Sequence, residues 1–244
     1  MMVGVLAMNL GAEPEAKNFT AKDGTEVLYR LVSPEKIEPG RVFPLVLFLH
    51  GSGERGSDNQ AQLKHGVMAI SEGAEKAGRG AYVIAPQCPE GQWWAEADAG
   101  WERLADAGGK NPLMDALVAL VEETAKVLPV DRGRMYVTGL SMGGFGTFDL
   151  LVRSPGVWAA AMPICGGGDP RTVGKFKDVP VRIFHGDVDD AVSPEARRVM
   201  AEALKEAGAD VELTMYAGVG HDSWTQTYAD AGVMGWLFSQ KKKE

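Results

Sequence analysis

The sequence predicts an α/β protein with a mostly parallel central sheet flanked by helices. Short apolar runs without alternation, such as residues 43–49, are typical of strands buried on both faces. Glycine-rich turns and helical patterns follow these runs, and strands that alternate with helices indicate parallel pairing. The 244 residues are 45% hydrophobic and 24% charged, which excludes a disordered chain and allows a sizeable core.

Seven apolar runs are interpreted as strands: residues 25–32, 43–49, 81–85, 134–138, 158–164, 181–184 and 211–216. Apolar residues at helical spacing predict a helix that begins at Asn111-Pro112 and another that begins at Ser193-Pro194-Glu195, since both openings carry capping or first-turn signals. Two further helices are expected over residues 145–152 and 222–238.

The chain is expected to form one domain over residues 1–244, because no internal repeat, linker or break in composition divides it. Residues 1–18 are interpreted as a trimmed leader or a domain junction, since no basic residue precedes the apolar part. Residues 86–110 lack clear periodicity. A long irregular segment inside a compact domain usually has a functional role, so we expect this loop to cover the site.

The net charge of −8 and the isoelectric point near 5.1 argue against a nucleic-acid partner, because a negative surface repels phosphates. No apolar run is long enough for a membrane span. Cys88 and Cys165 are too few for a disulfide scaffold and match no zinc motif. They either pair with each other or are buried thiols.

The most informative motif is Gly139-Leu140-Ser141-Met142-Gly143. It lies between the strand expected at 134–138 and a helical stretch, which is the context of a nucleophile elbow. In such an elbow the serine backbone is strained, and side chains at the flanking glycines would collide with neighbouring elements. Ser141 is therefore the candidate nucleophile. The alternative is a small-residue turn that lets a helix approach a strand.

A serine hydroxyl needs a base to act as a nucleophile at neutral pH. In sheets of this type the chain order is serine, acid, histidine. His50 and His65 precede Ser141, and His185 leaves no later strand end for the acid. By elimination His221, in a glycine-rich loop after the last strand, is the candidate base. The alternative is a surface-loop histidine.

Three carboxylates follow the strand expected at 181–184, where an acid should be presented: Asp187, Asp189 and Asp190. Their positions in the sequence alone do not show which of the three is the catalytic acid. Helix capping is the favoured interpretation of Asp190. In the glycine-rich turn at residues 50–56, Glu54 and Arg55 either form an ion pair that stiffens the turn or are solvated.

Acyl transfer also needs two preorganised N–H donors for the oxyanion. The elbow supplies the amide of Met142. The second donor is expected in the glycine-rich turn after residues 43–49, from Ser52 or Gly53, and we select Ser52. An ordinary glycine-rich turn is the alternative. A phosphate-binding loop would need a Gly-Lys-Ser/Thr sequence, which is absent from this turn.

Taken together, the motifs of this chain resemble those of the α/β-hydrolase superfamily, and the resemblance extends over residues 22–238. Within it, the chain is similar to bacterial carboxylesterases and to prolyl oligopeptidase-like and polyhydroxybutyrate depolymerase-like esterases. The resemblance rests on His50-Gly51-Ser52-Gly53, Pro86-Gln87-Cys88-Pro89, Gly139-Leu140-Ser141-Met142-Gly143-Gly144, Cys165-Gly166-Gly167, His185-Gly186-x-x-Asp189 and Gly220-His221-Asp222-Ser223-Trp224. It implies Ser141 as nucleophile, His221 as base and, among the three carboxylates, Asp189 as acid.

The expected function is hydrolysis of short to medium acyl esters of small molecules, without metal or organic cofactor. Trp93, Trp94 and Trp224 are expected to wall the substrate pocket, with packing beneath the long loop as the alternative. A small serine peptidase and a non-catalytic binding module are the rival functions. Relatives of this kind are often secreted or periplasmic, which implies export, and a cytoplasmic location is the alternative. The oligomeric state stays open.

Overall fold

The computed structural model describes residues 13–98 and 103–242, and within them eight strands form a single sheet. The sheet order is β1-β2-β4-β3-β5-β6-β7-β8, and all pairs from β4 to β8 are parallel, whereas β1–β2 and β2–β4 are antiparallel. The strands are β1 (Glu15–Thr20), β2 (Glu26–Val32), β3 (Phe43–Leu49), β4 (Tyr82–Pro86), β5 (Val130–Leu140), β6 (Ala160–Ile164), β7 (Val181–Gly186) and β8 (Val211–Tyr216).

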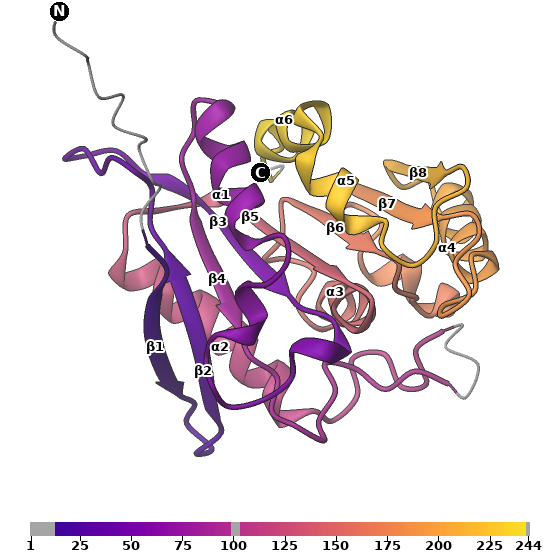
Figure 1. Cartoon of the computed structure of the whole chain (residues 1–244), viewed down its shortest axis with the longest axis horizontal. Helices are drawn as coiled ribbons and strands as arrows, with labels where there is room; N and C mark the ends of the chain where they lie inside the picture. The colour runs from indigo at the N-terminus through magenta and orange to yellow at the C-terminus, as the bar shows by residue number, and fades with distance from the viewer. Residues whose placement is uncertain (1–12, 99–102, 243–244) are drawn as a thin grey trace, which may run out of the picture.

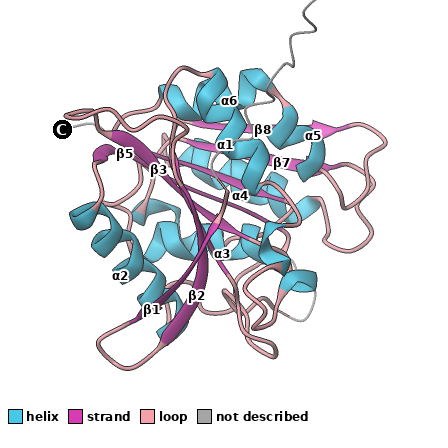
Figure 2. Cartoon of the chain, turned by 60° about the vertical axis from the view of Figure 1, so that its left-hand side comes forward, coloured by secondary structure: helices cyan, strands magenta, loops and turns pink. Residues whose placement is uncertain are grey.

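The structure describes six α-helices and three short 3₁₀ helices, of which two precede the first α-helix and one lies between the third and the fourth. Figures 1 and 2 show how the helices are arranged around the sheet. The α-helices are α1 (Val67–Lys76), α2 (Pro112–Val127), α3 (Met142–Arg153), α4 (Glu195–Glu206), α5 (Trp224–Ala229) and α6 (Ala231–Ser239). The 3₁₀ helices are η1 (Ser52–Glu54), η2 (Ala61–Leu63) and η3 (Pro170–Lys175). Within the described ranges, no helix is long and apolar enough to cross a membrane.

The sheet separates two hydrophobic cores, and β3 contributes to both. Leu45, Leu47 and Leu49 pack into a core with residues of α2, α3 and α4, whereas Val46 and Phe48 pack into a second core with α1, α5 and α6. All seven residues of β3 are buried. The uninterrupted apolar run therefore fills both faces of a central strand, because successive side chains point to opposite sides.

Parallel pairing brings the carboxyl ends of the central strands to one edge of the sheet. Leu49 at the end of β3 is in register with Gly139 of β5, and Leu140 is in register with Ile164 at the end of β6. The turns that follow β3, β5, β6 and β7 therefore meet at this edge, where open α/β sheets place their ligand sites.

The predicted fold class is confirmed: seven expected strands are present, and the sheet is mostly parallel. The sequence analysis missed β1, which is a polar edge strand with little apolar signal, and also missed α1. The expected closing helix is wrong as one element: Asp230 ends α5 and caps α6 by accepting from the amides of Gly232 and Val233.

Two local expectations are resolved by the structure. Asn111 caps α2 as expected, since its side chain accepts from the amide of Met114. By contrast, α4 begins after Pro194, and Ser193 makes no capping hydrogen bond. Cys88 and Cys165 are free buried thiols, so the unpaired alternative is the one observed.

Candidate active site

Ser141 lies at the junction of β5 and α3, where the chain turns sharply from strand to helix. Its backbone has φ 53° and ψ −118°, a conformation that non-glycine residues rarely adopt. A Cβ on Gly139 would lie 2.7 Å from the Leu49 carbonyl oxygen, and one on Gly143 would lie 2.9 Å from that of His50. The flanking glycines are therefore required by close backbone approach, as the elbow interpretation predicts.

The structure joins Ser141, His221 and Asp189 in a continuous hydrogen-bonded chain. His221 Nε2 lies 2.9 Å from Ser141 Oγ, and His221 Nδ1 lies 2.8 Å from Asp189 Oδ2. Since an ionised carboxylate can only accept, Nδ1 carries the hydrogen and Nε2 is free to accept the serine proton. An imidazole held in this tautomer is suited to act as a general base.

The Asp189 carboxylate is buried but extensively hydrogen-bonded. Its side chain has no exposed surface, Oδ1 accepts from the amides of Ala191 and Val192, and Oδ2 accepts from His221. Burial alone would raise its pKa, but the bonds from His221, Val192 and Ala191 together hold the pKa below its usual value. The group is therefore an anion at neutral pH.

The other two candidate carboxylates, Asp187 and Asp190, do not contact His221. Asp187 Oδ1 accepts from the amide of Gly218 at 2.7 Å, and so fastens the loop that carries His221. Asp190 is exposed. Its interpretation as a helix cap is wrong, because α4 starts five residues further on, at Glu195, and has no side-chain cap. Only Asp189 reaches His221.

The two expected oxyanion donors belong to turns that adjoin Ser141. Met142 is the first residue of α3, and Ser52 is the first residue of η1, just beyond β3. A Cβ built on Gly51 would lie 3.7 Å from Ser141 Cβ. The backbone of this turn therefore approaches the nucleophile closely.

His50 holds the turn after β3 in place, a role that the sequence did not reveal. It is buried, its Nδ1 lies 2.6 Å from the Gly51 carbonyl oxygen, and its Nε2 accepts from the Cys88 amide at 2.9 Å. Burial lowers its pKa to about 4, so the ring is neutral. His50 thereby ties the turn to the chain that leaves β4.

Arg55 braces the same turn from outside. Its Nε donates to the Ser52 carbonyl at 2.9 Å, its Nη1 donates to the Gln92 carbonyl at 3.3 Å, and the guanidinium lies 4.4 Å from the Trp93 ring centroid. The expected alternatives for Glu54 and Arg55 are both wrong. The two side chains take different partners, and buried Glu54 faces His65 at 3.7 Å.

The three tryptophans of the expected pocket differ in position. Trp94 is fully buried, and its indole donates to the His50 carbonyl, so its assignment to a pocket wall is wrong. Trp93 packs beneath Arg55. Trp224 is half-buried, and its ring lies edge-on to His221, with 5.4 Å between the centroids. Trp101, in the same long loop as Trp93, lies outside the described residues.

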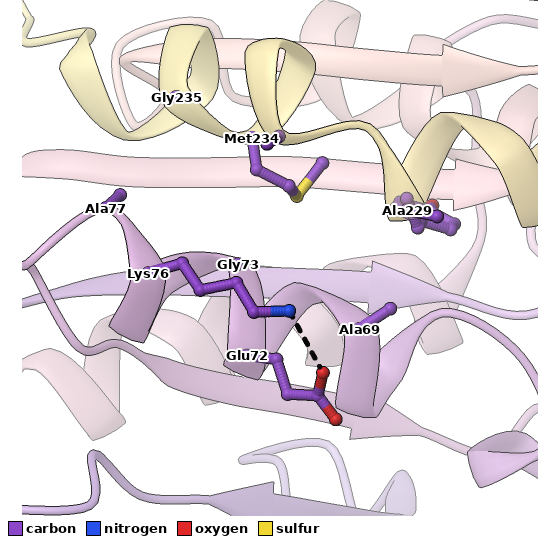
Figure 3. Close-up of a pocket in the computed structure, with 10 residues that line it drawn as sticks. Ala69, Glu72, Gly73, Lys76, Ala77, Ala229, Met234 and Gly235 are labelled. Carbon is purple, nitrogen blue, oxygen red and sulfur yellow. Dashed lines mark hydrogen bonds and ion pairs between the residues drawn. The ribbon is translucent and has the colours of Figure 1, made fainter.

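A surface groove between α1 and the α5–α6 segment has a volume of about 420 Å³ (Figure 3). Small and apolar side chains line most of it, and Lys76 reaches Glu72 at 3.5 Å along the exposed side of α1. None of its ten lining residues is a serine, cysteine or histidine. The groove therefore offers no nucleophile or base comparable to Ser141 and His221.

The fold and the strand–turn–helix junction at Ser141 define the class of α/β-hydrolases. The chain belongs to the dienelactone hydrolase family, whose model matches residues 67–234. The chain thus belongs to a family of hydrolases, and esterases are among its structural neighbours.

Individual relatives include esterases and a peptidase. A thermostable esterase of known structure is 34% identical, with a TM-score of 0.86, and the match covers 94% of this chain and 63% of the esterase. A ferulic acid esterase has a TM-score of 0.69 at 16% identity, covering 94% of this chain and 99% of that one. The "uncharacterized peptidase YuxL" of Bacillus subtilis (strain 168) is 24% identical over 86% of this chain and 35% of its own length. This chain therefore spans less than two thirds of the esterase and about a third of YuxL.

Proposed function

We propose that this hydrolase is a serine carboxylesterase that cleaves short to medium acyl esters through an acyl-enzyme. The observation that carries the proposal is the hydrogen-bonded chain from Ser141 through His221 to Asp189, with distances of 2.9 and 2.8 Å. It supplies a nucleophile, a base and an orienting anion at the sheet edge where such sites lie.

In the first half-reaction Ser141 Oγ attacks the ester carbonyl carbon, and its proton passes to His221 Nε2. The carbonyl electrons form an oxyanion, which the amides of Met142 and Ser52 bind. Collapse of the tetrahedral intermediate breaks the bond to the alcohol oxygen, which leaves with the proton from His221. Asp189 stabilises the imidazolium and preserves its orientation throughout.

In the second half-reaction a water molecule attacks the acyl-enzyme while His221 takes its proton. The acid leaves, Ser141 regains its proton, and the enzyme returns to its starting state. Trp224 is proposed to wall the acyl site, because its half-buried ring packs edge-on against His221. An apolar wall so close to the nucleophile favours a compact acyl group.

The test is hydrolysis of p-nitrophenyl esters from acetate to palmitate by the wild type and Ser141→Ala. We expect turnover of the shorter esters and a loss of about 10⁴-fold or more in the variant, with unchanged circular dichroism. Ser154→Ala is the matched control, because Ser154 lies at the far end of α3. Equal rates for wild type and Ser141→Ala would refute the mechanism.

A small serine peptidase is the second candidate, because YuxL is named a peptidase. Matched anilide and ester substrates with the same acyl group separate the two functions. The esterase proposal predicts a higher kcat/KM for the ester after correction for the intrinsic reactivity of each bond. A corrected preference for the anilide would favour the peptidase.

A further inference from the structure

His185 is the penultimate residue of β7, and its side chain lies against the Asp189 carboxylate. It is fully buried, and its Nε2 lies 2.9 Å from Asp189 Oδ2, the same oxygen that accepts from His221. The same Nε2 lies 3.0 Å from the Val192 carbonyl oxygen. Because a carbonyl oxygen can only accept, this nitrogen carries the hydrogen, and the positive N–H edge of the ring faces both oxygens.

His185 therefore contributes to the Asp189 site in two ways. It fastens the loop after β7, since Val192 donates its amide to Asp189 Oδ1 and offers its carbonyl to His185. It also places a partial positive charge against Oδ2. The ring is neutral at pH 7, because burial and then the positive charge of Arg197 lower its pKa to about 4.

Arg197 completes this arrangement from α4. It is fully buried, its Nη1 donates to the Ser193 carbonyl, and its guanidinium lies 5.3 Å from the centroid of the Phe145 ring. Its Nε and Nη2 have no hydrogen-bond partner among the described residues. Burial lowers the pKa of Arg197 to about 10, and the group remains a cation at neutral pH.

A buried cation is costly unless an opposite charge compensates it. Negative charge on Asp189 and, if it were ionised, on Cys165 favours the charged form of Arg197, whereas protonated His185 would repel it. Burial raises the pKa of the Cys165 thiol to about 12, so this thiol is neutral. Asp189 therefore attracts Arg197 through space, although the two side chains form no direct ion pair among the described residues.

We propose that His185 and Arg197 form a positioning pair that weakens the attraction of Asp189 for protonated His221, so that His221 is free to act as a base at a lower pH. The inference rests on the proposed function of Ser141, His221 and Asp189. Neither residue of the pair touches the substrate. Both act through the carboxylate, one by its N–H edge and one by its charge.

The test compares pairs of substitutions of similar size. In each pair, one substitution retains the N–H donor of His185 or the positive charge of Arg197, and the other removes it. His185→Gln retains an N–H donor and His185→Met does not, whereas Arg197→Lys retains a cation and Arg197→Met does not. The readout is the pH midpoint of the acid limb of kcat/KM for p-nitrophenyl acetate. The two methionine variants should move this midpoint upward by about 0.5–1 pH unit, and the conservative variants by less than half as much.

A purely structural role would lower kcat or the melting temperature without moving the midpoint upward. An unchanged or lowered midpoint in His185→Met and Arg197→Met would overturn the proposal. NMR titration of the His221 ring, assigned with His221→Asn, gives the same midpoint without turnover. If the wild type hydrolyses no ester, the esterase proposal fails, while the NMR titration still decides the role of the pair. If a methionine variant does not fold, the other variant decides.

Discussion

Two histidines occupy equivalent places in the fold and have different roles. His50 follows β3 and His185 lies near the end of β7; each precedes a glycine, is buried, and has a pKa lowered to about 4, mainly by burial. Both nitrogens of His50 contact backbone groups. In His185, Nδ1 has no hydrogen-bond partner among the described residues, and Nε2 faces a carboxylate. The same dipeptide thus braces a turn in one place and adjusts the electrostatics of an anion in the other.

The largest effect on activity is expected at Asp189, the carboxylate that contacts His185 but not His50. Asp189→Asn preserves shape, but an amide can present an N–H to His221 and favour the wrong tautomer. We expect kcat to fall by about 10³–10⁴-fold, with little change in KM. The measurement is steady-state hydrolysis of p-nitrophenyl butyrate. Asp190→Asn is the control, and a similar loss in this exposed neighbour would argue against the assignment of Asp189.

The next effect concerns folding at acid pH. In the unfolded chain the two histidines regain ordinary pKa values near 6.5, so between pH 6.5 and about 4 the unfolded state binds more protons. Stability is therefore full above pH 6.5 and falls as the pH drops towards 4, by about 3 kcal/mol for each histidine. Urea unfolding at pH 7 and 4.5 measures this loss.

His50→Gln and His185→Gln should each remove about half of this pH-dependent loss, because each removes one titrating ring. The two histidines should differ in their effect on activity. Substitutions of His185 should move the pH midpoint of the acid limb of kcat/KM, whereas substitutions of His50 should not. A wild-type protein equally stable at pH 7 and 4.5 would contradict the assignment of two neutral buried rings.

The smallest effect is expected at Arg55. Arg55→Met removes the bonds to the Ser52 and Gln92 carbonyls but preserves much of the packing on Trp93. A less rigid oxyanion turn should lower kcat by about 3- to 10-fold, because the turn is also held by His50. Arg79→Met is the control, because Arg79 precedes β4 and so lies at the opposite end of the parallel strands from Ser52. No loss of kcat would show that His50 alone holds the turn.

Much of this architecture could be predicted from the sequence because its signals are local. The apolar runs marked seven strands, and the glycines around Ser141 marked a turn with no room for side chains. Chain order singled out His221 among four histidines. By contrast, the choice of Asp189 over Asp187 and Asp190 needed the family resemblance, since all three follow the same strand.

The missed features depend on tertiary burial. Arg197 and Arg198 are neighbours of the same type, yet Arg197 is fully buried and Arg198 is exposed. Arg197 shares a helical face with Met200 and Leu204, whereas the apolar side chain of Val199, on the same helix, is 42% exposed. Trp94 was misassigned for a similar reason: composition marks a tryptophan, but only the packing against His50 shows that no substrate can reach it.

The most direct test of the central claim is covalent labelling of the nucleophile. Incubation with diethyl p-nitrophenyl phosphate, followed by mass spectrometry of the intact protein and its peptides, should show a single diethylphosphoryl group on Ser141. The adduct should be absent from Ser141→Ala and form far more slowly in His221→Asn, because the hydroxyl needs its base. An unmodified protein, or an adduct on another residue that persists in Ser141→Ala, would contradict the account.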